Sequence, residues 1–285
     1  MLIIPSYVHG GAWRDPLITA LTFLPTITCL LGSHVEEHIA GFSSLDYRLS
    51  PHPSFPQDVS TTPPRRLRNA KHPDHIQDIR SSLTFLEKTY NIADRYILVG
   101  HSCGATLAFQ TVMEIGDNIV ATNLCPSPPN PGPKPLLPSA IIGVAGIYDL
   151  RLLRNNHVQI PAYQTFLQDA FGPDEEVWDR VSPARRGKFK ETWKIGGNQG
   201  RTARVVVLAT STEDEMIEGE QLVVMKRRMD ELISADANLR VLVWDKKLKV
   251  THDVIWERGE GIAELVALAI KELMALQRWA AGRSE

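Results

Sequence analysis

Short apolar runs alternate along the chain with segments whose apolar positions recur every three or four residues. A short apolar run between turn residues is typical of a strand buried on both faces, and the wider spacing is typical of a helix with one buried face. This alternation predicts an α/β fold, in which a mostly parallel sheet is flanked by helices. We expect strands at 2–8, 42–47, 96–100, 139–145, 204–210 and 239–245.

The helical spacing predicts four main helices. The last of them groups Ile262, Leu265, Val266 and Ala269 on one face, and we interpret such faces as parts of the core. We expect the helices at 74–90, 103–115, 219–234 and 259–280.

Two segments interrupt this alternation. Residues 126–138 hold seven prolines, a density that excludes a helix or a central strand and predicts a loop or lid. Residues 182–203 are basic and contain glycine, which predicts a solvated connection before the next strand. Both segments look like insertions.

Composition narrows the classes of function. The chain has 285 residues, of which 43% are hydrophobic, and a net charge of −2. This length allows a substantial core, and the charge argues against nucleic acid or an anionic membrane as the main partner. Three irregularly spaced cysteines predict neither a disulfide framework nor a zinc site. Without a signal peptide or an apolar run that could span a bilayer, the sequence predicts a cytoplasmic, soluble protein.

The segment ILVGHSCGATLA, residues 97–108, places a serine between glycines where a strand meets a helix. A tight turn of this kind presents its serine as a nucleophile, and small neighbours let the crossing elements approach. We therefore predict Ser102 as the nucleophile, with Gly100 and Gly104 permitting the turn. The N–H of Cys103, at the start of the helix, is a candidate oxyanion donor. The alternative is a glycine-rich turn with an incidental serine.

The segment YVHGGAWRDP, residues 7–16, follows the first expected strand. Paired glycines leave backbone N–H groups accessible, so Gly10 and Gly11 are the other candidate oxyanion donors. We interpret His9 as a residue that shapes this loop rather than as a base. Trp13 fits a pocket wall and a packed core equally well.

His252 is the histidine best placed to act as a base. It follows the last expected strand, and loops after parallel strands emerge at the edge of the sheet where the serine turn lies. The acid that orients it should follow the preceding strand, where TEDEM offers Glu213, Asp214 and Glu215. We choose Asp214, interpret the two glutamates as surface charges, and keep Asp149 as the alternative acid.

These motifs together resemble those of fungal kynurenine formamidase, an α/β-hydrolase. The resemblance spans nearly the whole chain and is carried by His252 and by HGGAW (9–13), YRLSP (47–51), GHSCGAT (100–106), GIYDL (146–150) and EDEMI (213–217). It implies a single α/β-hydrolase domain over residues 1–285 that hydrolyses N-formyl-L-kynurenine to L-kynurenine and formate. This reaction belongs to the tryptophan breakdown that feeds NAD synthesis. The resemblance also implies Ser102 as nucleophile, Asp214 as acid, His252 as base, a small-molecule substrate and no metal or cofactor, and it allows a homodimer.

Two features separate this chain from that family. Relatives carry further strands before the HGG strand, whereas eight residues precede His9 here, so we expect a shortened sheet edge. The second feature is the two insertions, which bear on the pocket entrance. The pocket candidates are Trp13, Tyr47, Tyr148 and Trp256. For the substrate's amino-acid end, the sequence leaves both an arginine and a backbone nest open.

Two other functions compete with the formamidase hypothesis. The same triad would serve a general short-chain carboxylesterase, because only the pocket distinguishes the two activities. The second alternative is a catalytically inactive hydrolase fold that binds a small ligand. The intact set of Ser102, Asp214 and His252 argues against it.

Overall fold

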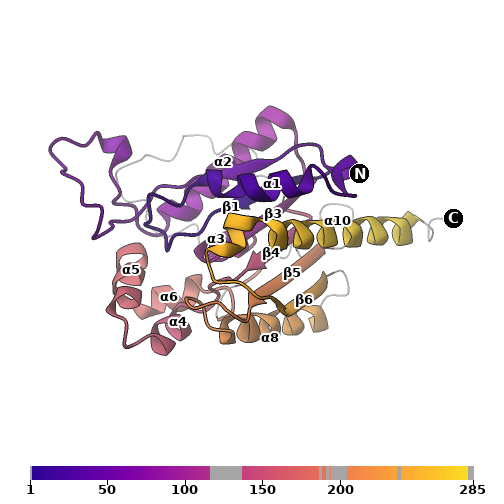
Figure 1. The fold of residues 1–285 in the computed structure, drawn as a ribbon. Helices are drawn as coiled ribbons and strands as arrows, with labels where there is room; N and C mark the ends of the chain where they lie inside the picture. The colour runs from indigo at the N-terminus through magenta and orange to yellow at the C-terminus, as the bar shows by residue number, and fades with distance from the viewer. Residues whose placement is uncertain are drawn as a thin grey trace.

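Six parallel strands form one sheet in the computed structural model (Figure 1), which describes residues 2–115, 137–185, 188–190, 193, 204–235 and 239–281. Each neighbouring pair is parallel. This confirms the α/β class and the strand positions expected from the apolar runs. Across the sheet the order is β2 (Ser43–Leu45), β1 (Ile4–Val8), β3 (Tyr96–His101), β4 (Ala140–Val144), β5 (Arg204–Ser211) and β6 (Leu239–Leu248).

The central strands are buried on both faces, which explains why they are continuous apolar runs. In β3, Leu98 belongs to the core on one face of the sheet, and Ile97 and Val99 belong to the core on the other face. The same alternation places Val206 and Val207 of β5 in opposite cores. Successive side chains of a strand point to opposite faces, so a strand covered on both sides needs an apolar residue at every position.

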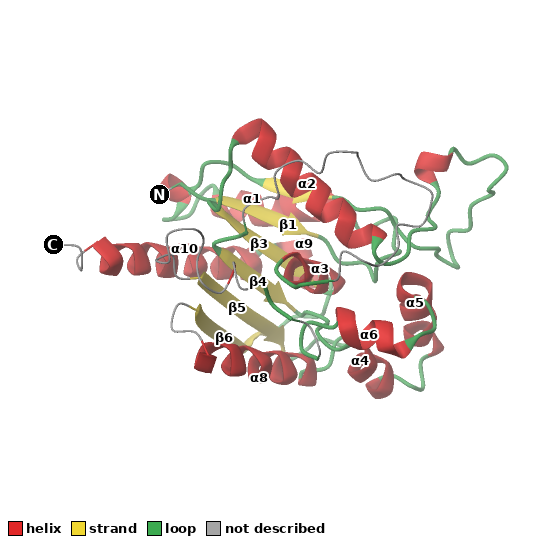
Figure 2. Ribbon diagram, turned by 180° about the vertical axis from the view of Figure 1, so that it is seen from behind, coloured by secondary structure: helices red, strands yellow, loops and turns green. Residues whose placement is uncertain are grey.

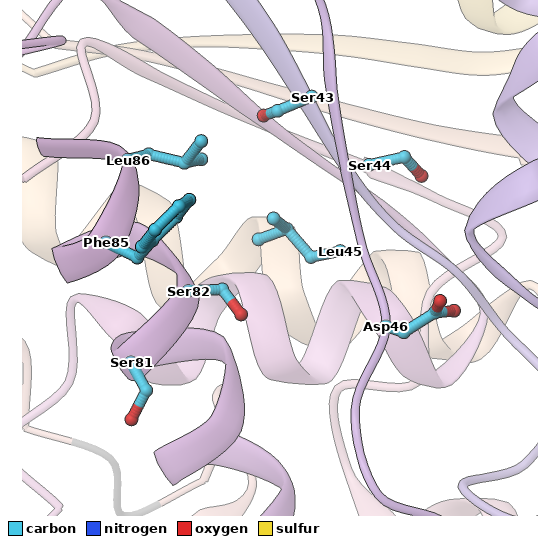
Figure 3. Close-up of a pocket in the computed structure, with 8 residues that line it drawn as sticks. All are labelled: Ser43, Ser44, Leu45, Asp46, Ser81, Ser82, Phe85 and Leu86. Carbon is cyan, nitrogen blue, oxygen red and sulfur yellow. The ribbon is translucent and has the colours of Figure 1, made fainter. Parts of the chain in front are cut away.

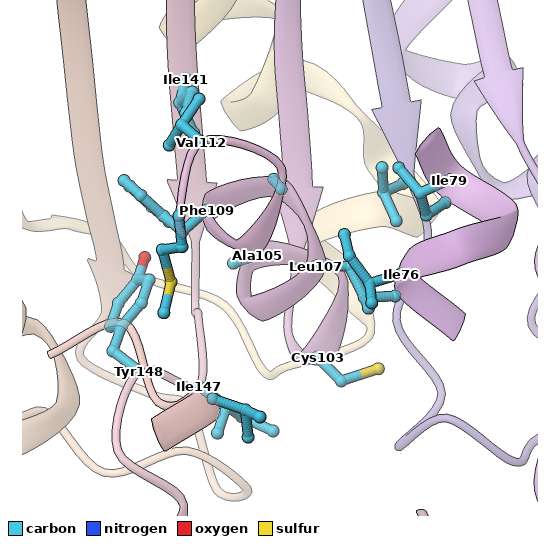
Figure 4. Close-up of a cluster of buried hydrophobic side chains, with 14 of the residues drawn as sticks. Ile76, Ile79, Cys103, Ala105, Leu107, Phe109, Val112, Ile141, Ile147 and Tyr148 are labelled. Carbon is cyan, nitrogen blue, oxygen red and sulfur yellow. The ribbon is translucent and has the colours of Figure 1, made fainter. Parts of the chain in front are cut away.

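Helices cover both faces of the sheet (Figures 1 and 2). One core is shared by α2 (Asp74–Tyr90), α3 (Cys103–Thr111) and α8 (Glu220–Ala235). Figure 4 shows part of it, with Leu107 of α3 beside Ile76 of α2. The opposite core is formed with α1 (Leu24–Leu30) and α10 (Glu260–Ala281). None of the described helices combines the length and apolar character needed to cross a bilayer.

A group of short helices separates β4 from β5 and was not expected from the apolar pattern. It consists of α4 (Leu150–Asn156), α5 (Pro161–Phe171) and α6 (Glu175–Val181). Figure 1 shows these helices together at one end of the sheet. The short α9 (Val254–Arg258) precedes α10, and 3-10 turns lie at Ala20–Phe23, Glu36–His38 and Pro64–Arg66.

Two expectations about the middle of the chain need correction. The helix expected at 103–115 ends at Thr111, because Met113 pairs with Phe189 in an isolated antiparallel bridge. The connection at 182–203 is not simply solvated where it is described, since Phe189 and Trp193 are buried. The proline-rich loop expected at 126–138 lies outside the described residues except for its last two.

β2 is the edge strand of the described sheet beside β1, and a hollow of about 630 Å³ lies between it and α2 (Figure 3). Phe85, with 61% of its surface exposed, contributes to its wall. The lining residues are Ser43, Ser44, Leu45, Asp46, Ser81, Ser82, Phe85 and Leu86. None of the predicted catalytic residues is among them.

Two histidines that follow β2, the buried His75 and the partly buried His72, are expected to make the fold sensitive to acid. Burial lowers the pKa of His75 to about 3 and that of His72 to about 4. The hydroxyl of Ser50 donates to the carbonyl of Ala70 at 2.8 Å, so His75 Nε2, 3.1 Å from that hydroxyl, must carry its hydrogen and donate. Because burial lowers its pKa to about 3, His75 is neutral in the folded protein at physiological pH.

We expect the free energy of unfolding to fall as the pH drops below about 6.5. The unfolded chain then binds protons on these two imidazoles, whereas the folded chain does not. Above that pH both states are unprotonated and the histidines contribute no pH dependence. Urea unfolding at pH 7.5 and pH 5 should show that His75→Gln removes about 2 kcal/mol of the acid-induced loss. The exposed His34→Gln serves as the control. An unchanged pH dependence in His75→Gln would contradict the assignment.

Candidate active site

Ser102 lies in a strained turn between β3 and α3. Its φ of 55° is in the left-handed region that residues with side chains rarely adopt. Its N–H donates to the carbonyl of Val144 at 3.0 Å, and its own carbonyl accepts the N–H of Ala105 at 3.0 Å. The turn is thus fixed by the neighbouring strand on one side and by the first turn of α3 on the other.

The glycines around Ser102 are explained by close packing of the backbone. A Cβ on Gly104 would collide with the carbonyl oxygen of Val8, and one on Gly100 would collide with the backbone of Gly104 and Ala105. A Cβ on Gly10 would lie 3.0 Å from the Cβ of Ser102, so the HGG loop passes directly beside the serine. Residues as small as glycine are therefore required where β1, β3 and α3 meet.

The loop after β1 is strained over three consecutive residues, since Gly11, Ala12 and Trp13 have φ values of 91°, 49° and 59°. The sulfur of Cys103 accepts the N–H of Trp13 at 3.3 Å, which ties the loop to the helix that follows Ser102. Among the hydrogen bonds of the described residues, none uses the N–H of Gly10 or Gly11. These two donors are consequently available at the serine turn.

The side chain of Tyr47 contacts the same loop. Its hydroxyl lies 3.0 Å from the carbonyl oxygen of Gly10, 3.2 Å from that of His9 and 3.5 Å from the sulfur of Cys103. Burial raises the pKa of the Cys103 thiol to about 11, so it is a neutral group and not a second nucleophile. His9 stacks on Tyr47 and contacts the carbonyl oxygen of Gly10 through Nδ1, in keeping with a shaping role.

His252 and Asp214 come together from the loops after β6 and β5. Nδ1 of His252 lies 2.9 Å from Oδ2 of Asp214, and both side chains are almost fully buried. The other carboxylate oxygen of Asp214 accepts the N–H groups of Met216 and Ile217 at 2.9 Å and 2.8 Å. A carboxylate held in this way keeps the hydrogen of His252 on Nδ1 and leaves Nε2 free to accept a proton.

The other acidic residues near these loops have different positions. Glu215 is exposed, as expected of a surface charge, but its carboxylate also accepts the backbone N–H of His252 at 3.0 Å. Glu213 is exposed. Asp149, the alternative acid, caps α4 through the N–H of Leu152 and pairs with Arg185 at 2.7 Å. The described contacts therefore bring Asp214, and not Asp149, to His252.

His101, next to Ser102 in the sequence, packs against His252, with the two ring centres 4.5 Å apart. Burial lowers the pKa of His101 well below its ordinary value, and the neighbouring His252 lowers it further. Its ring is therefore neutral and fills the space behind His252 without competing for the proton.

The pocket candidates are mostly buried. Trp13 has no exposed surface and Tyr148 has 1%, while Tyr47 has 6%. Trp256 is partly buried and donates from its indole to Asp253 at 3.1 Å. Their role as pocket walls stays a prediction.

The parallel sheet and the serine turn at its edge are typical of α/β hydrolases, and comparison with known families supports this class. The model of the alpha/beta hydrolase family matches residues 7–265. The chain belongs to the alpha/beta hydrolase family.

Sequence relatives confirm the resemblance to kynurenine formamidase that the motifs indicate. A protein of Fusarium equiseti named kynurenine formamidase-like hydrolase fscH is 37% identical over 95% of this chain and 83% of its own length. Kynurenine formamidase avaC of Aspergillus versicolor is 34% identical over 90% of this chain and 84% of its own length.

Solved structures share the fold at low sequence identity. An inhibited esterase B from Lactobacillus rhamnosis matches with a TM-score of 0.62 and 13% identity, covering 99% of this chain and 80% of that one. An esterase of Thermogutta terrifontis with bound propionate matches with a TM-score of 0.54 and 14% identity, covering 94% of this chain and 84% of that one. At these identities the likeness concerns the fold alone.

We expect Tyr47→Phe to lower kcat for hydrolysis of an aryl formamide or aryl ester roughly tenfold, because the loss of one buried hydroxyl frees the loop carbonyls. KM should change less, since the hydroxyl supports the loop and not the substrate. Steady-state kinetics check this, with the exposed Tyr90→Phe as the matched control. An unchanged kcat in Tyr47→Phe would show that the loop does not need this support.

Proposed function

We propose that this chain is a serine hydrolase that cleaves N-formyl-L-kynurenine to L-kynurenine and formate. The observation that carries the proposal is the contact of 2.9 Å between His252 and Asp214, at the sheet edge where the strained Ser102 turn lies. Its substrate follows from the relatives named kynurenine formamidase.

In the first step, the hydroxyl of Ser102 attacks the formyl carbon of the aryl formamide, and His252 accepts the hydroxyl proton on Nε2. Asp214 stabilises the imidazolium that forms. Among the described ion pairs, His252 is the one cationic partner of this buried carboxylate. The carbonyl oxygen becomes an oxyanion, for which the N–H groups of Gly10, Gly11 and Cys103 are the donors.

In the second step, the imidazolium of His252 gives its proton to the aniline nitrogen, and the C–N bond breaks. L-Kynurenine leaves, and the formyl group stays as an ester on Ser102. Water then loses a proton to His252, attacks this ester and releases formate. A formyl group is small, so the nearly closed surroundings of Ser102, with 6% of its surface exposed, suit the acyl side of such a substrate.

The first test compares hydrolysis of N-formyl-L-kynurenine with hydrolysis of a short-chain aryl ester. We expect wild-type turnover of the formamide, and a loss of at least about a thousandfold in Ser102→Ala, because the covalent route is removed. Ser81→Ala, an exposed serine on α2, is the matched control. Ester turnover alone would indicate a general carboxylesterase. A folded chain with neither activity would support a ligand-binding hydrolase fold.

A second test separates the two candidate acids. Asp214→Asn should lower kcat by about a thousandfold or more, because an amide can donate to Nδ1 and leave the hydrogen on Nε2, the wrong tautomer for a base. Asp149→Asn keeps an oxygen to cap α4 and should stay within about fivefold of wild type. Steady-state kinetics with circular dichroism as a folding check decide the matter. A larger loss in Asp149→Asn would contradict the assignment of Asp214.

The wider context of this reaction stays a prediction. The proposed substrate belongs to tryptophan breakdown that feeds NAD synthesis, and the mechanism above uses no metal or organic cofactor. The cytoplasmic location, the single-domain organisation and the homodimer are likewise expectations.

A further inference from the structure

Arg14 extends from the same turn as the proposed oxyanion donors. Its N–H donates to the carbonyl of Gly11 at 2.9 Å, and so does the N–H of Asp15. The preceding residue, Trp13, is tied to Cys103 beside the nucleophile. The base of the Arg14 side chain is therefore fixed relative to Ser102.

The guanidinium of Arg14 rests on the helices that separate β4 from β5. Its Cζ lies 5.5 Å from the ring centre of Phe166 on α5, and Trp13 packs against the rings of Phe166 and Phe171. This stacking fixes the plane of the guanidinium, and among the described residues Nη1 has no hydrogen-bond partner. The side chain is half-buried, and its Nη1 has no surface exposed to water.

Nη1 of Arg14 is a buried donor without a hydrogen-bond partner among the described residues. An unpaired buried donor on a charged group costs free energy, so such a group calls for an explanation. Asp169 and Asp15 attract the guanidinium, but no described ion pair joins either of them to it. Asp15 instead accepts the N–H of Leu17 at 2.9 Å.

Arg154 is an arginine with a structural role, and it serves as a comparison for Arg14. Arg154 also lies over an aromatic ring, with Cζ 5.6 Å from the ring centre of Trp178. Its guanidinium, however, is paired with Glu175 at 2.9 Å and bound to Gln164 at 3.0 Å. Arg14 has the same stacking without the carboxylate.

We propose that Arg14 binds the carboxylate of the amino-acid end of the substrate, and so selects aryl formamides that carry an α-amino acid. The inference rests on the proposed formamidase function and adds a determinant of substrate class to it. The planar fork of an arginine matches a carboxylate with two parallel hydrogen bonds, and a half-buried setting strengthens them. A carboxylate that reached the guanidinium would supply the partner that Nη1 lacks.

The test uses two substrates with the same reacting group. N-Formyl-L-kynurenine carries the amino acid, and 2′-formamidoacetophenone keeps the aryl formamide and its ketone but lacks that end. We expect Arg14→Met to lower the ratio of their kcat/KM values by about tenfold to a hundredfold, mainly through KM for the carboxylate substrate. Arg14→Lys, which keeps the charge but not the fork, should give an intermediate ratio.

The matched control is Arg154→Met, which removes a stacked arginine that already has a carboxylate partner, and its ratio should equal that of wild type. Because both substrates are measured on one preparation, the fraction of folded enzyme cancels from the ratio. An unchanged ratio in Arg14→Met, with both formamides still hydrolysed, would overturn this inference alone. Wild-type failure on both formamides would overturn the proposed function, and this inference with it.

Discussion

The packing of α3 against the end of β1 is the contact on which the candidate site depends. Gly104 lies so close to the carbonyl of Val8 that no side chain fits between them. This approach brings the start of α3 beside the HGG loop, where the sulfur of Cys103 meets the N–H of Trp13. The positive φ of Ser102 is the local cost of joining β3 to a helix in that position. Ser102, the proposed nucleophile, and the loop that would hold its oxyanion are thus placed by one backbone contact.

His252 and Asp214, the proposed base and acid, lie at the same sheet edge but follow different strands. β5 and β6 are parallel neighbours, so the loops that carry Asp214 and His252 leave the sheet side by side. Ser211, at the end of β5, joins them further, because its hydroxyl accepts the N–H of Val250 at 3.0 Å. A buried carboxylate is stable only where it is bound, and Asp214 has two backbone donors as well as His252. The geometry of this pair is therefore set before any substrate binds.

The parts of the fold that could be predicted from the sequence are those governed by periodicity and chain order. Strands buried on both faces are apolar at every position, and His252 and Asp214 could be found because they follow the last two strands. The helices α4 to α6 could not, because each is short and buries only a few residues, such as Trp178 and Phe166. The link between Tyr47 and Cys103 also escaped prediction, since it joins residues 56 positions apart.

Other arginines near the helices between β4 and β5 form ion pairs, and the unpaired nitrogen of Arg14 differs from them. There Arg185 binds both Asp149 and Asp179, and Arg151 reaches Asp179 at 2.9 Å. Arginines that join these helices are therefore paired with carboxylates. Arg14 lies against the same group of helices with Asp169 nearby, yet no described ion pair forms. A shortage of acidic residues therefore does not account for its free donor. A donor kept unpaired on a loop that Cys103 holds in place has the arrangement of a group that is completed by a ligand.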